Sequence, residues 1–417
     1  MSALGRLAVG LASEIVAVRK ASDDVSTTDV VAAAMLGFVS EPGDGVMGGL
    51  VSVLGVGRVA DAVRSDVTVG DLHAEATEAG STLEAREIDA GLGRWRPRLD
   101  DAAFGRAFAQ AARIGARLVV PGDDDWPDGM RGLDAHAPLA LWVRGRVGAL
   151  AQGRSIALVG ARAATNYGVH VTAESAAGLV DRGITIVSGG AYGIDGTAHR
   201  AALASGGDTI AFLAGGVDRF YPAGHESLLT RVAETGAVAS ELACGAAPTR
   251  WRFLQRNRLI AAASDATVVL EAGMRSGSLN TAGHASALGR PLGAVPGPVT
   301  SPASAGCHRL LREYDAVCVT DAAQMAELVP ERTVANAGGG LVDDGAVLGR
   351  GSGLLDALSG DEGRVFDALG PQRARTVGEL VERSGTTVPV VLGALGALEA
   401  VGLAAARADG WVRRRPS

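Results

Sequence analysis

Short apolar runs alternate with amphipathic stretches through the middle of the chain. Runs such as Ser155–Gly160 and Ala266–Ala272 are almost continuously apolar, which is typical of strands buried on both faces of a parallel sheet. This alternation predicts an α/β fold, with a mainly parallel sheet between helices. The expected strands are Ser155–Gly160, Thr185–Ser188, Thr209–Gly215, Ala237–Leu242, Ala266–Ala272, Pro291–Gly297 and Ala316–Thr320. The expected helices are Val169–Arg182, Gly196–Ala204, Glu226–Thr235, Gln255–Ser264, Leu279–Leu288 and Cys307–Glu313.

The N-terminal part of the chain has a helical pattern. Alanine-rich amphipathic stretches occupy Asp29–Val39, Gly48–Ser65 and Asp100–Ala116. Leu54-Gly55-Val56-Gly57 resembles the turn of a helix-hairpin-helix module, which offers backbone N–H groups to DNA phosphate, although an ordinary turn between helices has the same composition. Two apolar strands within residues 118–145 then lead into the central domain.

The C-terminal part predicts a winged helix. Helices are expected over Glu362–Leu369, Val377–Ser384 and Val388–Val401, followed by a β-ribbon around Asp409-Gly410. The third helix contains no Arg, Lys, Asn or Gln, so we expect contact with protein there rather than reading of base edges. The predicted organisation is a helical domain over 1–117, an extended Rossmann-like domain over 118–329, a glycine-rich linker over 330–353 and a winged-helix-like domain over 354–417.

Composition limits the class of protein. Of 417 residues, 47% are hydrophobic, which excludes disorder for most of the chain. No apolar run reaches the ~18 residues of a membrane span, and no signal-peptide pattern is present, so a cytoplasmic protein without a membrane partner is expected. Cys244, Cys307 and Cys318 lack metal-binding spacing and are interpreted as core residues. Neither a metal nor another cofactor is expected.

The distribution of charge says more than its total. The net charge of −7 argues against a polyanionic partner, but Thr249–Arg312 holds eight arginines against Asp265 and Glu271 alone. A local basic excess of this kind is the electrostatic footprint of a polyanion site. A solvated surface without a ligand is the alternative interpretation.

Glycine- and hydroxyl-rich turns follow the predicted strands. At the carboxyl ends of parallel strands, such turns leave N–H groups available for an anion, and nearby arginines supply opposite charge. We therefore predict a phosphate-binding edge. The turns are Gly160-Ala161-Arg162, Ser188–Gly196, Arg256-Asn257-Arg258, Arg275–Ala282 and Ala294–Gly297.

Two common phosphate-binding sites that contain such turns, the P-loop and the dinucleotide-binding fingerprint, are excluded. A P-loop needs a lysine beside its glycines, and Lys20 is the only lysine in the chain. A dinucleotide fingerprint needs Gly-x-Gly-x-x-Gly and an acidic residue ~20 positions later. Here Arg162 stands where the backbone should approach pyrophosphate, and the acid is missing.

No convincing catalytic set can be assembled. Asp195 is expected to cap a helix that begins at Gly196, and His199 on that helix is as readily a packing residue as an acid or base. Glu241 and Glu271 end strands, where they could hold Arg258 and Arg275 in position.

The order of the motifs closely resembles the DNA-processing protein A family, also called Smf. The resemblance covers residues ~120–325 and is specific because many motifs occur in order, whereas the terminal segments match only in layout. They run from Gly160 through Ser188–His199, Gly206–Ala211, Gly216–Pro222, Ser240-Glu241, Phe253–Ala261, Arg275–Ala282 and Val295–Gly297 to Gly306-Cys307.

The resemblance implies a Rossmann-like domain that binds single-stranded DNA without sequence preference, forms a homodimer and passes the strand to the RecA recombinase in natural transformation. It implies no enzymatic activity. The phosphate contacts that it implies are two turns, a basic rim and a pocket. They comprise Gly160, Arg162, Ser188, Gly189, Gly190, Ala191, Gly193, Asp195, Arg256, Asn257, Arg258, Arg275, Ser276, Gly277, Ser278 and Thr281.

The sequence departs from the family pattern at two positions, and one rival class stays open. His225 and His308 replace the family's usual asparagines, which puts local polar contacts in doubt. The rival is a nucleotide-binding enzyme of the phosphoribohydrolase type, whose Gly-Gly-x-Gly-Thr-x-x-Glu motif corresponds to Ser276–Ala285, where no glutamate occurs. Exposed aromatic residues among the turns could stack on bases.

Overall fold

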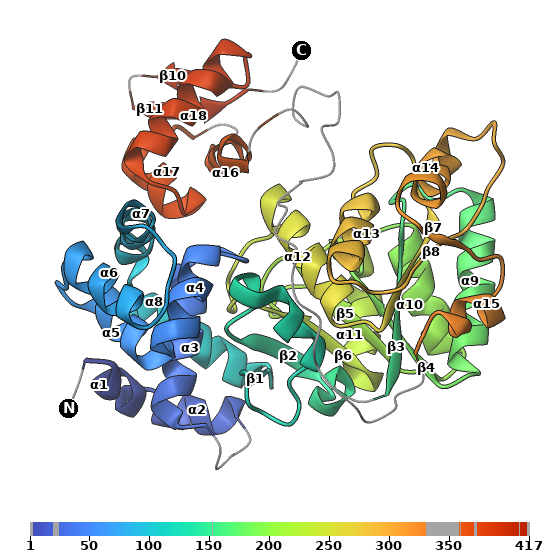
Figure 1. Cartoon of the computed structure of the whole chain (residues 1–417), viewed down its shortest axis with the longest axis horizontal. Coiled ribbons are helices and arrows are strands. Elements are labelled where there is room, and N and C mark those ends of the chain that lie inside the picture. Colours follow the sequence, from blue (N-terminus) through green and yellow to red (C-terminus); the bar gives the residue numbers. More distant parts are fainter. Residues whose placement is uncertain are drawn as a thin grey trace.

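The computed structural model describes residues 3–19, 25–151, 153–330, 358, 360–370, 373–407 and 409–414. The predicted linker lies outside the described residues except for residue 330, and Lys20 lies outside them too. The described part forms a helical layer, a central sheet with its helices and a small C-terminal unit (Figure 1).

The central sheet has nine strands in the order β1-β2-β6-β5-β4-β3-β7-β8-β9. From β6 to β9 neighbouring strands are parallel, whereas β2 runs antiparallel to both β1 and β6. The predicted mainly parallel sheet is therefore confirmed, with two antiparallel strands added at one edge. The strands are β1 Arg117–Val119, β2 Leu141–Gly145, β3 Arg154–Gly160, β4 Ile184–Ser188, β5 Thr209–Phe212, β6 Ala237–Ser240, β7 Ala266–Glu271, β8 Leu292–Ala294 and β9 Val317–Cys318.

Helices cover both faces of this sheet because side chains alternate along each strand. In β3, Ile156 and Leu158 pack with α9, α10 and α15, whereas Ala157 and Val159 pack with α12, α13 and α14 on the other face. Helix α11 lies against β5 and β6. The helices are α9 Asn166–Val180, α10 Ile194–Ala204, α11 Glu226–Thr235, α12 Arg250–Ala262, α13 Ser278–Ala287, α14 Ala305–Glu313 and α15 Ala322–Glu327.

The N-terminal helices share their core with one edge of the sheet. Phe108 of α8 packs edge-on against Trp142 of β2, with ring centroids 5.0 Å apart. Both belong to one apolar cluster that continues from these helices to Val217 and Cys244. The helices are α1 Ala3–Gly10, α2 Ala12–Val18, α3 Thr27–Val39, α4 Gly45–Leu54, α5 Val56–Arg64, α6 Val69–Glu78, α7 Ala85–Trp95 and α8 Asp101–Arg113.

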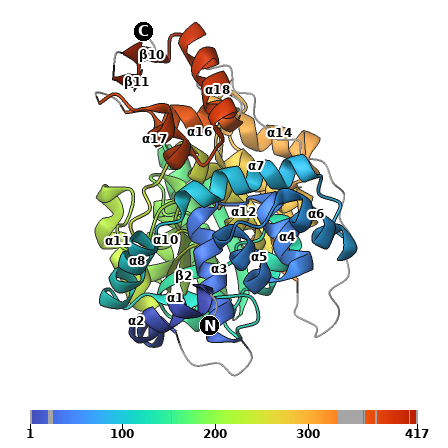
Figure 2. The same ribbon diagram turned by 90° about the vertical axis from the view of Figure 1, so that its left-hand side faces the viewer.

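The C-terminal unit has the predicted winged-helix order. Thr376 and Glu379 form a capping box at the start of its second helix. Figure 2 shows this unit above α7 and α12. Its elements are α16 Gly360–Ala368, α17 Val377–Ser384, α18 Val388–Ala400, β10 Ala404–Arg407 and β11 Gly410–Arg413.

Two details differ from the sequence-based predictions, whereas a third agrees with them. The stretch Gly48–Ser65 is divided into α4 and α5 at Gly55, which adopts φ +80°, so the turn expected at Leu54–Gly57 is present. Helix α12 begins at Arg250, five residues before the predicted start, where the Thr249 hydroxyl accepts a hydrogen bond from the Arg252 N–H. Cys318 is exposed and is not a core residue, whereas Cys244 and Cys307 are buried.

Among the described residues, no single helix is long and apolar enough to cross a bilayer. Only α4 and α5 taken together pass that test, and they are bent by 119°.

Candidate nucleic-acid interface

The turn between β3 and α9 is built around a buried glutamate from the neighbouring strand. Glu271, at the end of β7, accepts hydrogen bonds from the Thr165 N–H (2.8 Å) and the Thr165 hydroxyl (2.6 Å). The backbone of β7 also accepts the Ala161 N–H. A Cβ on Gly160 would lie 2.5 Å from Ile194 Cγ1, so this position requires glycine. Glu271 therefore orders this turn through Thr165.

Arg162 is the exposed cation of this turn. Its guanidinium lies 5.0 Å from the ring centroid of Phe253 on α12. Phe253 in turn lies 5.5 Å from the ring of Tyr221, which is 49% exposed. These three side chains join a positive charge to aromatic surface, the combination that binds a single strand through phosphate and base.

The glycine turn between β4 and α10 is closed by its own carboxylate. Asp195 accepts from the N–H groups of Gly189 (3.2 Å) and Ala191 (3.4 Å). The helix begins at Ile194, with Gly193 as its N-cap residue. The prediction that Asp195 caps a helix beginning at Gly196 is therefore wrong.

Asp195 is buried inside the turn. Burial raises the pKa of its carboxyl, while Arg256 and the two N–H groups oppose that rise. Because the carboxylate is acceptor-only when ionised, it positions the turn and is not itself a group that attracts phosphate. In the part of the chain that the structure describes, the N–H groups of Tyr192 and Gly193 have no protein acceptor. They lie at the positive end of α10.

The basic rim that the sequence suggested, Arg256, Asn257 and Arg258, is buried. This is the largest difference between the expected and the observed site. Arg256 donates to the carbonyls of Gly189 (2.7 Å) and Phe212 (2.5 Å). Asn257 donates to the Gly277 carbonyl at 3.2 Å. These bonds tie the β4–α10 and β7–α13 turns to α12.

Arg258 makes a third such connection. Its guanidinium forms a two-point ion pair with Glu241 at 2.7 and 2.6 Å and also donates to the His136 carbonyl at 2.9 Å. The prediction that Glu241 holds Arg258 is confirmed. With only 2% of Arg258 exposed, a charge reversal there would disrupt the fold and would not report on a surface contact.

The turn between β7 and α13 carries the other exposed arginine, Arg275. The hydroxyls of Ser276 and Ser278 lie 2.7 Å apart, whereas Gly277 is exposed and Ser278 and Thr281 are buried. The structure therefore brings Arg162, Arg275 and Gly277 to the accessible part of the edge. It places Ser188, Gly189, Gly190, Asp195, Arg256, Asn257, Arg258, Ser278 and Thr281 beneath it, and leaves Gly160, Ala191, Gly193 and Ser276 half-buried.

Histidines support the turns from outside. His225 Nδ1 lies 3.0 Å from the Gly190 carbonyl, and His308 Nε2 lies 3.0 Å from the Gly297 carbonyl. His199 is buried beside Thr209, and burial lowers its pKa to about 3. A neutral, enclosed imidazole of this kind is a packing group.

The close approach at Gly193 gives a testable prediction. Gly193 adopts φ +78°, and a Cβ there would collide with the carbonyl oxygens of Ala161 and Arg162. We expect Gly193→Ala to destabilise the protein by about 2–4 kcal/mol in denaturant unfolding, because backbone strain adds to overpacking.

Gly206→Ala is the matched control for this change. Gly206 also has positive φ, but a Cβ there would meet open space, so about 1 kcal/mol is expected from the backbone alone. Equal losses in the two variants would contradict a close packing of the two turns.

Comparison with known proteins places this geometry in context. The model of the family described as DNA recombination-mediator protein A matches residues 117–330, and that of the DprA winged helix domain matches residues 353–410. A DNA processing protein DprA of Mycobacterium tuberculosis is 45% identical over 390 residues, which cover 91% of this chain and 92% of that protein. Protein Smf of Escherichia coli is 35% identical over 310 residues, covering 71% and 77% of the two chains. The solved structure of DprA from Streptococcus pneumoniae is similar with a TM-score of 0.58 and 28% identity, covering 74% of this chain and 100% of that one.

Proposed function

Because this chain belongs to the DNA recombination-mediator protein A family, we propose that it binds single-stranded DNA along the carboxyl edge of its central sheet. The observation that carries the proposal is the grouping of Arg162, Phe253 and Tyr221 beside the unpartnered N–H groups of the β4–α10 turn. Phosphate would lie against Arg162 and that turn, with bases against the aromatic rings. Since none of these groups reads a base edge, binding should not depend on sequence.

The further steps are proposed by resemblance to the family. We propose that the protein protects incoming single strands and loads RecA recombinase onto them during natural transformation or recombination. In this proposal it acts as a cytoplasmic homodimer and without catalysis. The winged-helix unit has no Arg or Lys on its third helix, which supports a role in protein contact.

Titration of labelled oligonucleotides tests the proposal. We expect single-stranded DNA to bind more tightly than duplex, and oligothymidine and mixed sequences to bind alike. The logarithm of the binding constant should fall linearly with the logarithm of salt concentration, with a slope of about −0.7 for each phosphate contact. Absence of single-strand binding at low salt would contradict the proposal.

Two separate assays address the finer points. RecA filament formation on strands coated with single-strand-binding protein should accelerate when this protein is added, if it loads RecA. Incubation with AMP should release no free base, whereas measurable release would favour the phosphoribohydrolase alternative.

A further inference from the structure

The C-terminal unit is docked onto the first turn of α12. The backbone N–H of Trp251 donates to Asp367 Oδ2 on α16 at 3.2 Å. The Arg364 guanidinium lies 4.4 Å from the centroid of the Trp251 ring. Gly360 packs so closely that a Cβ there would lie 3.2 Å from the same ring. Helix α16 therefore covers the N-terminus of α12 from another part of the chain.

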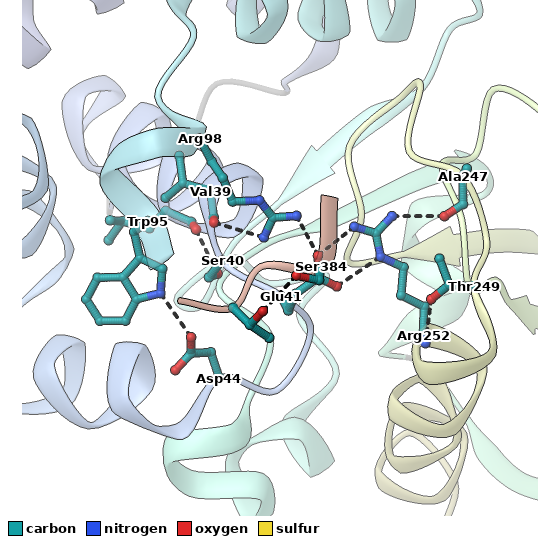
Figure 3. A network of polar contacts seen from close by, with 12 residues as sticks. Val39, Ser40, Glu41, Asp44, Trp95, Arg98, Ala247, Thr249, Arg252 and Ser384 are labelled. Atoms are coloured by element: carbon teal, nitrogen blue, oxygen red, sulfur yellow. Dashed lines mark hydrogen bonds and ion pairs between the residues drawn. The ribbon is translucent and has the colours of Figure 1, made fainter. Parts of the chain in front are cut away.

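A second contact fixes the same unit to the N-terminal helices. Gly385 adopts φ +66° after α17, and a Cβ there would lie 2.8 Å from both Arg98 Nη1 and Glu41 Cγ. Glu41 accepts hydrogen bonds from Arg98 at 2.5 Å and from Arg252 at 2.7 and 3.0 Å (Figure 3). The docked unit therefore covers a buried ion network that joins α12 to the helical layer.

This docking position borders the candidate interface. Helix α12 starts at the carboxyl edge of the sheet, and Phe253, two residues beyond Trp251, lies under Arg162. The Asp367 carboxylate accepts a hydrogen bond from the backbone N–H of Trp251 and interacts electrostatically with Arg413 and Arg250. A helix N-terminus flanked by arginines favours an anion, and here the anion is a side chain of the protein itself.

We propose that this docking is autoinhibitory: Asp367 holds the place of a strand phosphate at the start of α12, so that the winged-helix unit must leave before DNA occupies that part of the interface. The inference rests on the proposed function, since the competitor is the backbone of single-stranded DNA. Carboxylate and phosphate are both anions and exclude one another from one site. The apparent affinity is then the intrinsic affinity reduced by the fraction of molecules that are undocked.

Two substitutions in the full-length protein should weaken docking, because each removes a different contact between the C-terminal unit and α12. Asp367→Asn removes the anion but keeps the shape of the side chain, and Arg364→Ala removes the contact with the Trp251 ring. We expect each to bind labelled oligothymidine about 3- to 10-fold more tightly than the unmodified protein, as release of a mostly docked state predicts. Glu382→Gln is the matched control, because it removes the same charge from an exposed position on α17 and should leave affinity nearly unchanged.

Docking itself is read by fluorine NMR of 5-fluorotryptophan-labelled protein, with the Trp251 resonance assigned through Trp251→Phe. Oligothymidine should move that resonance toward its position in Arg364→Ala. Equal affinities of the unmodified protein, Asp367→Asn and Arg364→Ala, with an unmoved Trp251 resonance, would overturn autoinhibition and leave the proposed function intact. Failure of every one of these proteins to bind oligothymidine would instead contradict the proposed function.

Discussion

Arg162→Glu is expected to weaken binding of single-stranded oligonucleotides by at least about tenfold, and equally for all sequences. Arg162 is exposed at the end of β3, and its guanidinium is stacked on Phe253. Reversal of its charge both removes a phosphate partner and sets a carboxylate in the path of the strand. The slope of the logarithm of the binding constant against the logarithm of salt concentration should also become shallower by about 0.7. Fluorescence anisotropy at several salt concentrations measures both quantities.

Arg182→Glu provides the control for net charge. Arg182 is also exposed, but it stands just before β4, at the amino edge of the sheet. We expect a small loss that disappears at moderate salt, because long-range effects of an exposed charge are screened. Equal losses in the two variants would show that binding depends on total charge and would remove the interface from the carboxyl edge.

Glu41→Gln should destabilise the protein by about 3–5 kcal/mol, because it leaves two buried arginines without their shared anion. Glu41 is 7% exposed, and both Arg98 and Arg252 donate to it. Denaturant unfolding at neutral pH measures the loss. Glu75→Gln is the matched control: its ion pair with Arg58 is more than one-third exposed on each side, so no more than about 1 kcal/mol is expected. Similar losses in both variants would contradict a structural role for the buried network.

The same network gives a dependence on pH. Burial alone would raise the pKa of Glu41, but the charges and hydrogen bonds of Arg252 and Arg98 overcome it and lower the pKa from 4.5 to about 2. A lowered pKa in the folded state stabilises the protein above pH 4.5, and that contribution is lost as pH falls toward 2. It amounts to about 3 kcal/mol. Between pH 4.5 and pH 2, the free energy of unfolding of Glu41→Gln should therefore fall less than that of the unmodified protein.

The sequence predicted the architecture well because the sheet is buried on both faces. Strands such as Ser155–Gly160 and Ala266–Ala272 are short apolar runs with few other interpretations, and β3 and β7 match them within one residue at each end. The ends of α11 and α17 were also predicted correctly. The glycine turns follow the strands as expected, because a parallel sheet places all of those turns on one edge.

The accessibility of individual site residues could not be predicted in the same way. The sequence suggested a surface rim at Arg256, Asn257 and Arg258, because these side chains are polar and belong to a basic stretch. In the fold they face carbonyls and a carboxylate supplied by residues 17 to 122 positions away. Partners at such separations leave no local periodicity, and the same holds for Asp367, which contacts Trp251 across 116 positions.

Those buried connections determine how the edge responds to a ligand. Helix α12 is bonded to the β4–α10, β6–α12 and β7–α13 turns, and Glu271 adds the β3–α9 turn. Four loops that would each lose conformational entropy on binding are thus ordered before a ligand arrives. The cost of immobilising them is met during folding, so association needs little rearrangement of the protein. Most of the conformational entropy lost on binding is then that of the flexible DNA strand. The entropy of binding should therefore depend on the length of the strand and not on the mobility of the loops.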